Sequence, residues 1–417
     1  MSAERHVVVI GAGVIGVCSA FYLVRRGFRV TVVDRDEPAH EGCSFGNAGM
    51  IVPSHFVPLA APGMVALGLK WMWNPESPFW VKPRLSPELL GWGWKFCRAA
   101  NARKVAQAAP LLRDLHVASR AAFEELSSAD DFGLVKKGLL MLCQTEHTLE
   151  EEMKAAELAR QLGVPAEVLD AHGAGRLEPN VRMNIAGAVY FPNDCHLPPA
   201  RFMHSMRERL AKSGVQFSWG ANVTNFQRNG NRIDAIDSSQ GTLRGDEYVL
   251  CGGSWSTRIA RQLELKLPMQ AGKGYSLTLP TPRYLPNTCA ILCEARVAVT
   301  PMGNALRFGG TMEIAGLNED INPVRVQGII KSALRYYPDL RAEDFAGVEP
   351  WCGLRPCSPD GLPYIGRPAR YSNLTIATGH AMMGLSLGPV TGQLVADILA
   401  NANPSIDISQ LNPNRYS

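Results

Sequence analysis

The N-terminal region alternates between short apolar runs and turns in a pattern that predicts one complete strand–helix–strand unit. Residues 6–10 form a β-branched apolar run, which is typical of a buried parallel strand. A glycine turn follows, and an apolar helical stretch after it closes at residues 25–27. Residues 28–33 then predict a second strand that ends at Asp34. This region therefore predicts a βαβ unit of a parallel sheet.

Further elements follow from the same patterning. Residues 273–279 alternate as a strand with one polar and one apolar face. Near the C-terminus, residues 379–384 predict a turn, and Pro389 lies in the first turn of a helix with one apolar face. Additional strands are predicted at residues 248–250, 297–300, 306–310 and 374–378, of which the second and third form a hairpin.

Length and composition narrow the class of protein. A chain of 417 residues predicts two domains, and 46% apolar with 19% charged residues indicates a globular protein. The net charge of +4 without a basic run gives no reason to expect nucleic acid. The ten cysteines are scattered without metal-ligand spacing, so we expect reduced thiols in a cytoplasmic protein and no metal. Residues 7–24 carry no charge, but their glycines argue against a membrane helix.

The glycines after the first strand have separate roles in a dinucleotide site. Gly11 permits the tight turn, Gly13 lets backbone N–H groups approach a pyrophosphate, and Gly16 lets helix pack on strand. The helix N-terminus then faces the phosphates with the positive end of its dipole. Asp34 follows at the spacing at which a carboxylate accepts hydrogen bonds from ribose hydroxyls. The alternative is a tight glycine turn without a ligand.

Two other features, a loop and a helix, favour FAD over NAD. Residues 44–50 form a second small-residue loop where an extended cofactor continues past its pyrophosphate. The helix that begins near Pro389 can direct its dipole at the flavin pyrimidine oxygen, where negative charge accumulates on reduction. A plain strand–helix junction is the alternative. No second glycine fingerprint with an acidic partner supports a bound nicotinamide.

The residues expected to bind FAD come from the glycine turn, the 44–50 loop, the middle of the chain and the C-terminal turn. They are Gly11, Gly13, Val14, Ile15, Gly16, Asp34, Arg35, Ser44, Asn47, Ala48, Gly49, Met50, Val223, Gly252, Gly253, Gly379, Met383, Gly384 and Leu385.

The chain resembles the D-amino-acid dehydrogenase small-subunit family, within the wider glycine oxidase, sarcosine oxidase and D-amino-acid oxidase superfamily. The resemblance rests on VVVIGAGVIGVCSAFYLVRRGFRVTVVDRD, SFGNAGMIVPSHFVPLAAPG, KGYSLTL, WCGLRPCSPDGLPYIGR and TGHAMMGLSLGPVTGQLVADIL. It implies an α/β fold, in which a Rossmann-type FAD-binding domain is joined to a discontinuous α+β substrate domain. The FAD domain is then expected over residues 1–55, 185–262 and 350–417, and the substrate domain over 56–184 and 263–349.

An amino-acid substrate needs a group that neutralises its carboxylate. Arg355 precedes a proline that favours extended geometry, its planar fork matches a carboxylate, and the resemblance implies this role. The alternative is a surface ion pair with Asp360. The resemblance also implies that Tyr275 touches the carboxylate or covers the pocket, and His380 is a candidate for contacting the cofactor. Cross-strand packing for Tyr275 and a structural loop role for His380 stay open.

The expected reaction is oxidation of the Cα–N bond of a D-amino acid, with electrons passed to a quinone or another carrier. The segment 50–55 also resembles relatives that act on D-proline or cis-4-hydroxy-D-proline. A glycine- or sarcosine-type oxidase that uses oxygen is one alternative. A flavin-binding subunit without turnover is another.

A tryptophan-rich insertion over residues 64–100 has two interpretations. Five tryptophans lie there among basic residues: Trp71, Trp73, Trp80, Trp92 and Trp94, with Lys70, Lys82, Arg84, Lys95 and Arg98. Aromatic and basic residues together are typical of a membrane interface, which would make the protein peripheral on the inner face of the plasma membrane. A lid packed on the substrate domain is the other interpretation.

Overall fold

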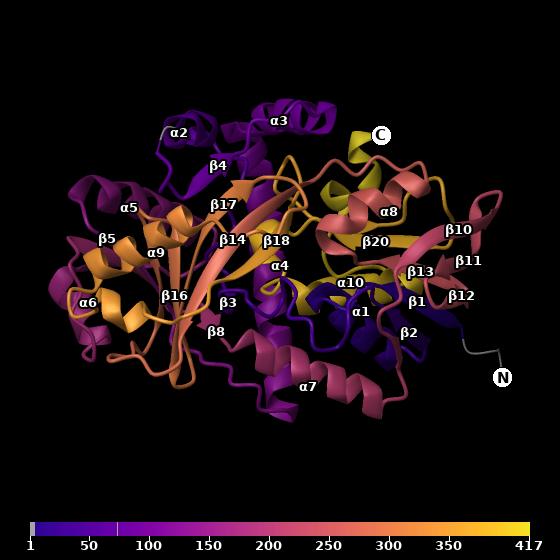
Figure 1. Cartoon of the computed structure of the whole chain (residues 1–417), viewed down its shortest axis with the longest axis horizontal. Helices are drawn as coiled ribbons and strands as arrows, with labels where there is room; N and C mark the ends of the chain where they lie inside the picture. The colour runs from indigo at the N-terminus through magenta and orange to yellow at the C-terminus, as the bar shows by residue number, and fades with distance from the viewer. Residues whose placement is uncertain (1–4, 73) are drawn as a thin grey trace.

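The computed structural model describes residues 5–72 and 74–417, so Trp73 of the insertion lies outside the described residues. Two large sheets dominate the fold, with the nine-stranded sheet on the left of Figure 1 and the six-stranded sheet on the right. Ten α-helices surround these sheets within the described chain: α1 (Val14–Arg25), α2 (Met64–Trp71), α3 (Pro87–Ala99), α4 (Ala102–Ala129), α5 (Glu146–Gln161), α6 (Ala171–Leu177), α7 (Pro199–Lys212), α8 (Ser256–Gln262), α9 (Pro323–Tyr336) and α10 (Gly388–Leu399).

The six-stranded sheet has a parallel core, as the N-terminal pattern predicts. Its order is β19 (Tyr364–Gly366), β20 (Leu374–Thr378), β13 (Glu247–Leu250), β1 (His6–Ile10), β2 (Arg29–Val33) and β9 (Gln216–Ser218). Only β19 is antiparallel to its neighbour. The predicted strands at residues 6–10 and 374–378 are confirmed, and β2 begins one residue later than predicted. The Rossmann-type arrangement brings strands from both ends of the chain and its middle together.

Helices cover this parallel core and bury its apolar strands. Helix α1 packs against α10 and α7, and α10 also contacts α4. Pro389 lies in the first turn of α10 as predicted, and the apolar face of the helix is buried. The close α1–α10 contact depends on a small residue, because a Cβ on Gly392 would lie 2.5 Å from the Cys18 carbonyl oxygen. This packing fixes the turn before α10 next to the glycine turn before α1.

The nine-stranded sheet is mostly antiparallel. Its order is β18 (Trp351–Cys357), β14 (Gln270–Leu279), β17 (Ala305–Ile314), β16 (Val297–Met302), β15 (Cys289–Leu292), β5 (Leu139–Cys143), β7 (Gly187–Phe191) and β6 (Glu167–Asp170), with β4 (Phe79–Val81) paired to β17. The predicted hairpin is confirmed as β16 and β17. Two smaller sheets combine β10 (Val223–Asn229), β11 (Arg232–Ser238) and β12 (Gly241–Leu243), and β3 (Met50–Ile51) with β8 (Cys195–His196).

Strand β14 confirms the strand predicted at residues 273–279 and begins earlier, at Gln270. Both of its faces are buried, and even Lys273 is only 2% exposed. The reason is that β18 and β17 flank the strand. On one face Ser276 contacts the 44–50 loop, and on the other Tyr275 belongs to a buried apolar cluster with residues of α9. The alternation in this segment is therefore between small and large side chains rather than between solvent and core.

The predicted domain boundaries stay a prediction. Two strand pairings concern where the second and third segments of the predicted FAD domain begin. The segments 185–262 and 350–417, predicted for the FAD domain, each begin with a strand of the nine-stranded sheet. These are β7, which pairs with β5 and β6, and β18, which pairs with β14. The pairings favour later starts for both segments.

The insertion forms α2, β4 and α3, which lie together along the upper edge in Figure 1. Ser86 caps the N-terminus of α3, because its hydroxyl accepts a hydrogen bond from the Leu89 N–H, and Pro87 occupies the first turn of the helix. Within the described part of the chain, no helix combines the length and apolar character needed to cross a bilayer.

Candidate active site

A cavity of about 690 Å³ opens between the two large sheets. Most of the residues predicted to bind the cofactor line it: Gly11, Gly13, Val14, Ile15, Asp34, Arg35, Ser44, Asn47, Val223, Gly252, Gly253, Gly384 and Leu385. Two of the three predicted catalytic residues, Arg355 and His380, line it as well. The cavity therefore joins the glycine turn to strand β18 of the other sheet.

The glycine turn has the geometry that its three glycines predict. Gly11 has φ +111°, which favours glycine, and a Cβ there would lie 2.5 Å from the Cys251 carbonyl oxygen. A Cβ on Gly16 would lie 1.8 Å from the Gly11 carbonyl oxygen, so this glycine serves the packing of α1 on β1 and does not line the cavity. Gly13 is different, because its φ is −70° and no protein atom would approach its Cβ closer than 3.4 Å. The open space in front of Gly13 fits a phosphate at the start of α1.

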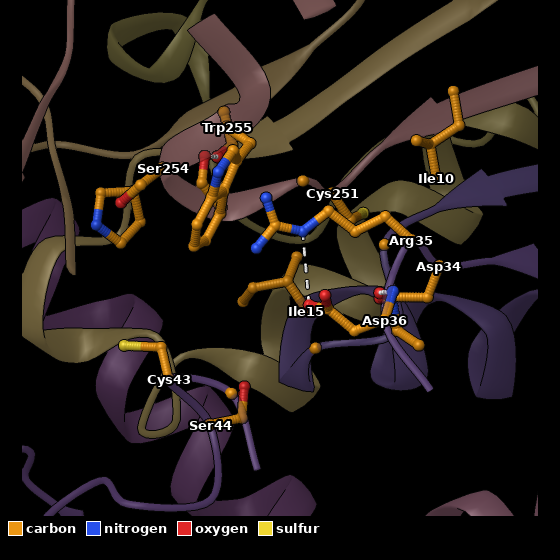
Figure 2. A pocket seen from close by; sticks show the side chains of 18 of the residues that line it. Ile10, Ile15, Asp34, Arg35, Asp36, Cys43, Ser44, Cys251, Ser254 and Trp255 are labelled. Atoms are coloured by element: carbon orange, nitrogen blue, oxygen red, sulfur yellow. Dashed lines mark hydrogen bonds and ion pairs between the residues drawn. The ribbon is translucent and has the colours of Figure 1, made fainter. Parts of the chain in front are cut away.

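Asp34 organises the nucleotide side of the cavity. Its carboxylate accepts hydrogen bonds from the backbone N–H groups of Ala12 and Asp36, so its oxygens are held at the edge of the glycine turn. Arg35 reaches across the pocket in Figure 2, with its guanidinium 3.8 Å from the Trp255 ring centroid and its Nε 3.3 Å from Asp36. Carboxylates, a guanidinium and an aromatic ring together suit a ribose and an adenine.

The loop at residues 44–50 is held against the nine-stranded sheet by its carbonyl groups. Arg307 donates to the carbonyl oxygens of Phe45 (3.0 Å) and Asn47 (2.8 Å), and the Ser276 hydroxyl donates to that of Gly46 (3.2 Å). The Ser44 hydroxyl accepts the Val14 N–H at 2.9 Å, which ties the loop to α1 as well. The loop thus connects α1 to the nine-stranded sheet, while Ala48, Gly49 and Met50 do not line the cavity.

Arg355 is the cationic side chain that β18 presents to the cavity. One of its terminal nitrogens donates to the Thr311 carbonyl oxygen at 2.5 Å, and among the described residues it forms no ion pair. The alternative pairing with Asp360 is excluded, because Asp360 is bound by two nitrogens of Arg415 at 2.8 and 3.0 Å. Burial lowers the pKa of the Arg355 guanidinium. The site therefore holds a partly desolvated guanidinium whose other N–H groups can donate hydrogen bonds to a bound group.

Gly274 provides the surface on which Arg355 lies. In the β14–β18 register Gly274 pairs with Gly353 and Gly272 pairs with Arg355, so all four share one face of the sheet. A Cβ on Gly274 would lie 2.1–2.2 Å from three guanidinium atoms of Arg355. Only glycine at this position lets the guanidinium lie flat against β14.

Tyr275 lies on the opposite face of the same strand. It is 1% exposed and does not line the cavity, and its hydroxyl donates to Glu313 at 2.7 Å. Alternation along β14 explains this, because the side chain at 275 points away from the face that carries Gly274. The structure does not bring Tyr275 to Arg355.

His380 follows β20 and is buried at the cavity wall. Its Nε2 is 3.0 Å from the Thr391 hydroxyl, and its Nδ1 has no hydrogen-bond partner among the described residues. Burial lowers the pKa of His380 to about 3, so the imidazole is neutral at physiological pH. It can contact a bound group without adding positive charge to the site.

Some predicted residues support the site from outside the cavity, and some lining residues escaped prediction. Gly379 and Met383 do not line the cavity, and at Gly379 the reason for glycine is a φ of +83° beside Tyr364. The unpredicted lining residues include Cys43, Arg207, Trp219, Ser254, Trp255 and Arg258. They lie on loops and helices that lack a recognisable motif, although Ser254 and Trp255 directly follow the predicted Gly252 and Gly253.

Comparisons with known proteins agree with this geometry. Residues 6–398 match the DAO family, described as FAD dependent oxidoreductase. A D-amino acid dehydrogenase of Bradyrhizobium diazoefficiens is 33% identical, covering 99% of both chains, and one of Rhizorhabdus wittichii is 35% identical, covering 98% of this chain and all of that one. The glycine oxidase structure from Geobacillus kaustophilus has a TM-score of 0.78 at 23% identity, covering 99% of this chain and 100% of that one.

Proposed function

This chain belongs to the DAO family of FAD-dependent oxidoreductases, and we propose that it is a D-amino acid dehydrogenase that oxidises the Cα–N bond of its substrate. Relatives with that name match nearly the whole chain. The observation that carries the proposal is Arg355, a cavity-lining guanidinium without an acidic partner among the described residues. An amino-acid carboxylate supplies the partner that this cation lacks.

The proposed roles of the residues follow from their positions. Arg355 binds the substrate carboxylate through two parallel hydrogen bonds and thereby fixes the orientation of Cα. The glycine turn and Asp34 would hold FAD, which when bound would supply the hydride acceptor. His380 is neutral, so it adds no positive charge beside Arg355. The substrate amine gives its proton to solvent before the Cα–H bond breaks.

The test is anaerobic reduction of the purified holoprotein. D-Alanine, D-proline and cis-4-hydroxy-D-proline are added separately, with the L-enantiomers as controls, and the visible flavin band is followed. We expect bleaching by D-substrates, and the segment 50–55 favours the two cyclic ones. A yellow protein that no amine bleaches would support the alternative of a flavin-binding subunit and overturn the proposal.

We further propose that a quinone or another carrier, rather than oxygen, accepts the electrons. After reduction by substrate, a soluble ubiquinone analogue is expected to reoxidise the flavin much faster than air-saturated buffer. Stoichiometric hydrogen peroxide in air would instead support an oxidase of the glycine or sarcosine type.

The insertion favours a peripheral contact with an anionic membrane surface, which we propose as the site of electron delivery. Its inner side packs on the end of β18, because Trp92 is 7% exposed and its Nε1 donates to the Cys357 carbonyl oxygen at 2.9 Å. Its outer side exposes large apolar residues: Leu69, Leu85, Leu90 and Trp94, which are 58–103% exposed. Basic residues at 70, 82, 84, 95 and 98 outnumber the acidic residues at 76 and 88. Apolar residues with excess positive charge suit an anionic bilayer.

Co-sedimentation with lipid vesicles tests this contact. The protein is expected to sediment with anionic phosphatidylglycerol vesicles and less with neutral phosphatidylcholine, and the double substitution of Leu90 and Trp94 by serine is expected to abolish sedimentation. Leu158→Ser, an exposed leucine on α5, is the matched control. Equal binding of the double variant would contradict the proposal.

A further inference from the structure

Strand β17 contains a bulge directly beside Arg355. Lys273 of β14 pairs with Glu313, whereas Tyr275 pairs with Gly310, so two β17 residues lie opposite Gly274 alone. One of the two is Thr311, which has φ +68° although it is β-branched. Such a backbone is strained in a threonine and persists only when its surroundings hold it.

The bulge determines where Arg355 lies. The Thr311 carbonyl oxygen accepts the hydrogen bond from Arg355 at 2.5 Å. The guanidinium lies flat against the opposite residue, Gly274, which has no Cβ to block it. Flattening the bulge would rotate this carbonyl and remove the acceptor that fixes Arg355. The position of the carboxylate anchor therefore depends on a strained peptide.

On the face of the sheet opposite Arg355, Glu313 contacts two β14 side chains whose positions lie on either side of the bulge. It is 4% exposed and accepts the Tyr275 hydroxyl at 2.7 Å, and its other oxygen lies 3.7 Å from Lys273 Nζ. Along β17, Tyr275 pairs with the residue before the bulge, Gly310, and Lys273 pairs with the residue after it, Glu313. Arg325 of α9 adds a third contact at 3.7 Å, and its own terminal nitrogen donates to the Ser77 carbonyl oxygen.

We propose that Glu313 is a positioning residue for Arg355, which it orients by holding the Thr311 bulge from the opposite face of the sheet. Its carboxylate joins β17 to two β14 side chains that flank the bulge, so the strained conformation is stabilised by contacts that never enter the cavity. This inference rests on the proposed function, because it gives Arg355 the carboxylate.

The test of the Glu313 proposal measures how tightly the holoprotein binds a carboxylate, and it does not require turnover. Benzoate, which has a carboxylate but no oxidisable amine, is titrated into the holoprotein and its Kd is taken from the perturbation of the flavin band. Glu313→Gln is expected to raise the benzoate Kd at least tenfold while flavin content is retained. Thr311→Gly is expected to leave the Kd within threefold, because glycine adopts positive φ without strain and the backbone carbonyl remains.

Rescue separates positioning from a merely structural role. In the double variant Glu313→Gln/Thr311→Gly, the Kd is expected to return to within threefold of the parent value. Glu178→Gln is the matched control, because Glu178 is another buried carboxylate that accepts backbone N–H groups, at Asn287 and Thr288. It is expected to lower the thermal midpoint without changing the Kd.

Two results would overturn the inference: an unchanged Kd in Glu313→Gln, or a double variant that binds benzoate as weakly as the single one. If Glu313→Gln does not retain flavin, Tyr275→Phe carries the test, since it removes only the hydroxyl contact and is expected to raise the Kd threefold or more. Arg355→Met checks the premise separately. If that variant binds benzoate normally, the proposed anchor fails, whatever Glu313 does.

Discussion

Gly274→Ala tests whether the flat seat under Arg355 matters for catalysis. The new Cβ would lie 2.1–2.2 Å from three guanidinium atoms, against about 3.5 Å for ordinary contact, so the guanidinium must move by more than about 1 Å. A displacement of ~1 Å in a positioned group costs about 100-fold in rate. Loss of one charge-assisted hydrogen bond, at about 1.5–3 kcal/mol, gives the same range. We therefore expect kcat/KM for a D-amino acid to fall between about 10- and 100-fold, mainly through KM.

The fold is expected to tolerate this substitution. The clash involves the end of a flexible side chain, and Gly274 does not have positive φ, so the free energy of unfolding should change by less than about 1 kcal/mol. The assay compares steady-state kinetics with a dye acceptor, flavin absorbance and thermal midpoints. Gly91→Ala on α3, where a Cβ meets nothing within 4 Å, is the control and should leave kcat/KM unchanged. A KM within twofold of the parent in Gly274→Ala would refute the reasoning.

Three further predictions address the site and the buried charges. Arg355→Lys keeps the charge but loses the planar fork, so kcat/KM should fall at least tenfold; parent-like kinetics would contradict a bidentate role. Asp34→Asn should lower the flavin-to-protein absorbance ratio after dialysis, because one of the oxygens that accept from Ala12 and Asp36 becomes a donor; full retention would count against the ribose assignment. Burial raises the pKa of Asp194 from 3.8 to about 7, so between these pH values the folded state binds a proton that the unfolded state has lost. The free energy of unfolding therefore falls as pH rises through this range, by about 1.4 kcal/mol per pH unit. Asp194→Asn should flatten the loss of stability to urea between pH 5 and pH 8, and an unchanged slope would exclude this carboxyl as its source.

The sequence predicts those parts of the fold whose conformation is determined locally. The positive φ at Gly11 and the packing at Gly16 against the Gly11 carbonyl group are both internal to one βαβ unit, and both are confirmed. The strands at residues 6–10 and 374–378 are also confirmed, because buried parallel strands appear as continuous apolar runs. The pairing of β7 and β18 with the nine-stranded sheet depends on contacts between distant segments, which no local pattern contains.

For the site, the sequence could identify chemical candidates but not their neighbours. It predicted Arg355 from its proline and its motif, whereas its carbonyl partner at Thr311 lies on another strand. It could not exclude an Arg355–Asp360 pair, because the competing Arg415 is distant in sequence and reaches Asp360 only in the folded chain. Arg307, which binds the carbonyls of the 44–50 loop, carries no sequence signal apart from its place in a predicted strand.

Strand β14 shows why polarity alone misleads in a strand that is covered on both faces. Lys273 and Tyr275 are its most conspicuous residues, and both lie on the face opposite Arg355. The face toward Arg355 carries small residues instead, because a guanidinium lying flat on a strand leaves no room for a Cβ. Substitutions at Lys273 or Tyr275 can therefore affect substrate only by changing strand geometry, whereas those at Gly274 act on Arg355 directly. In such a strand, the smallest residues indicate where the cavity-lining cation lies.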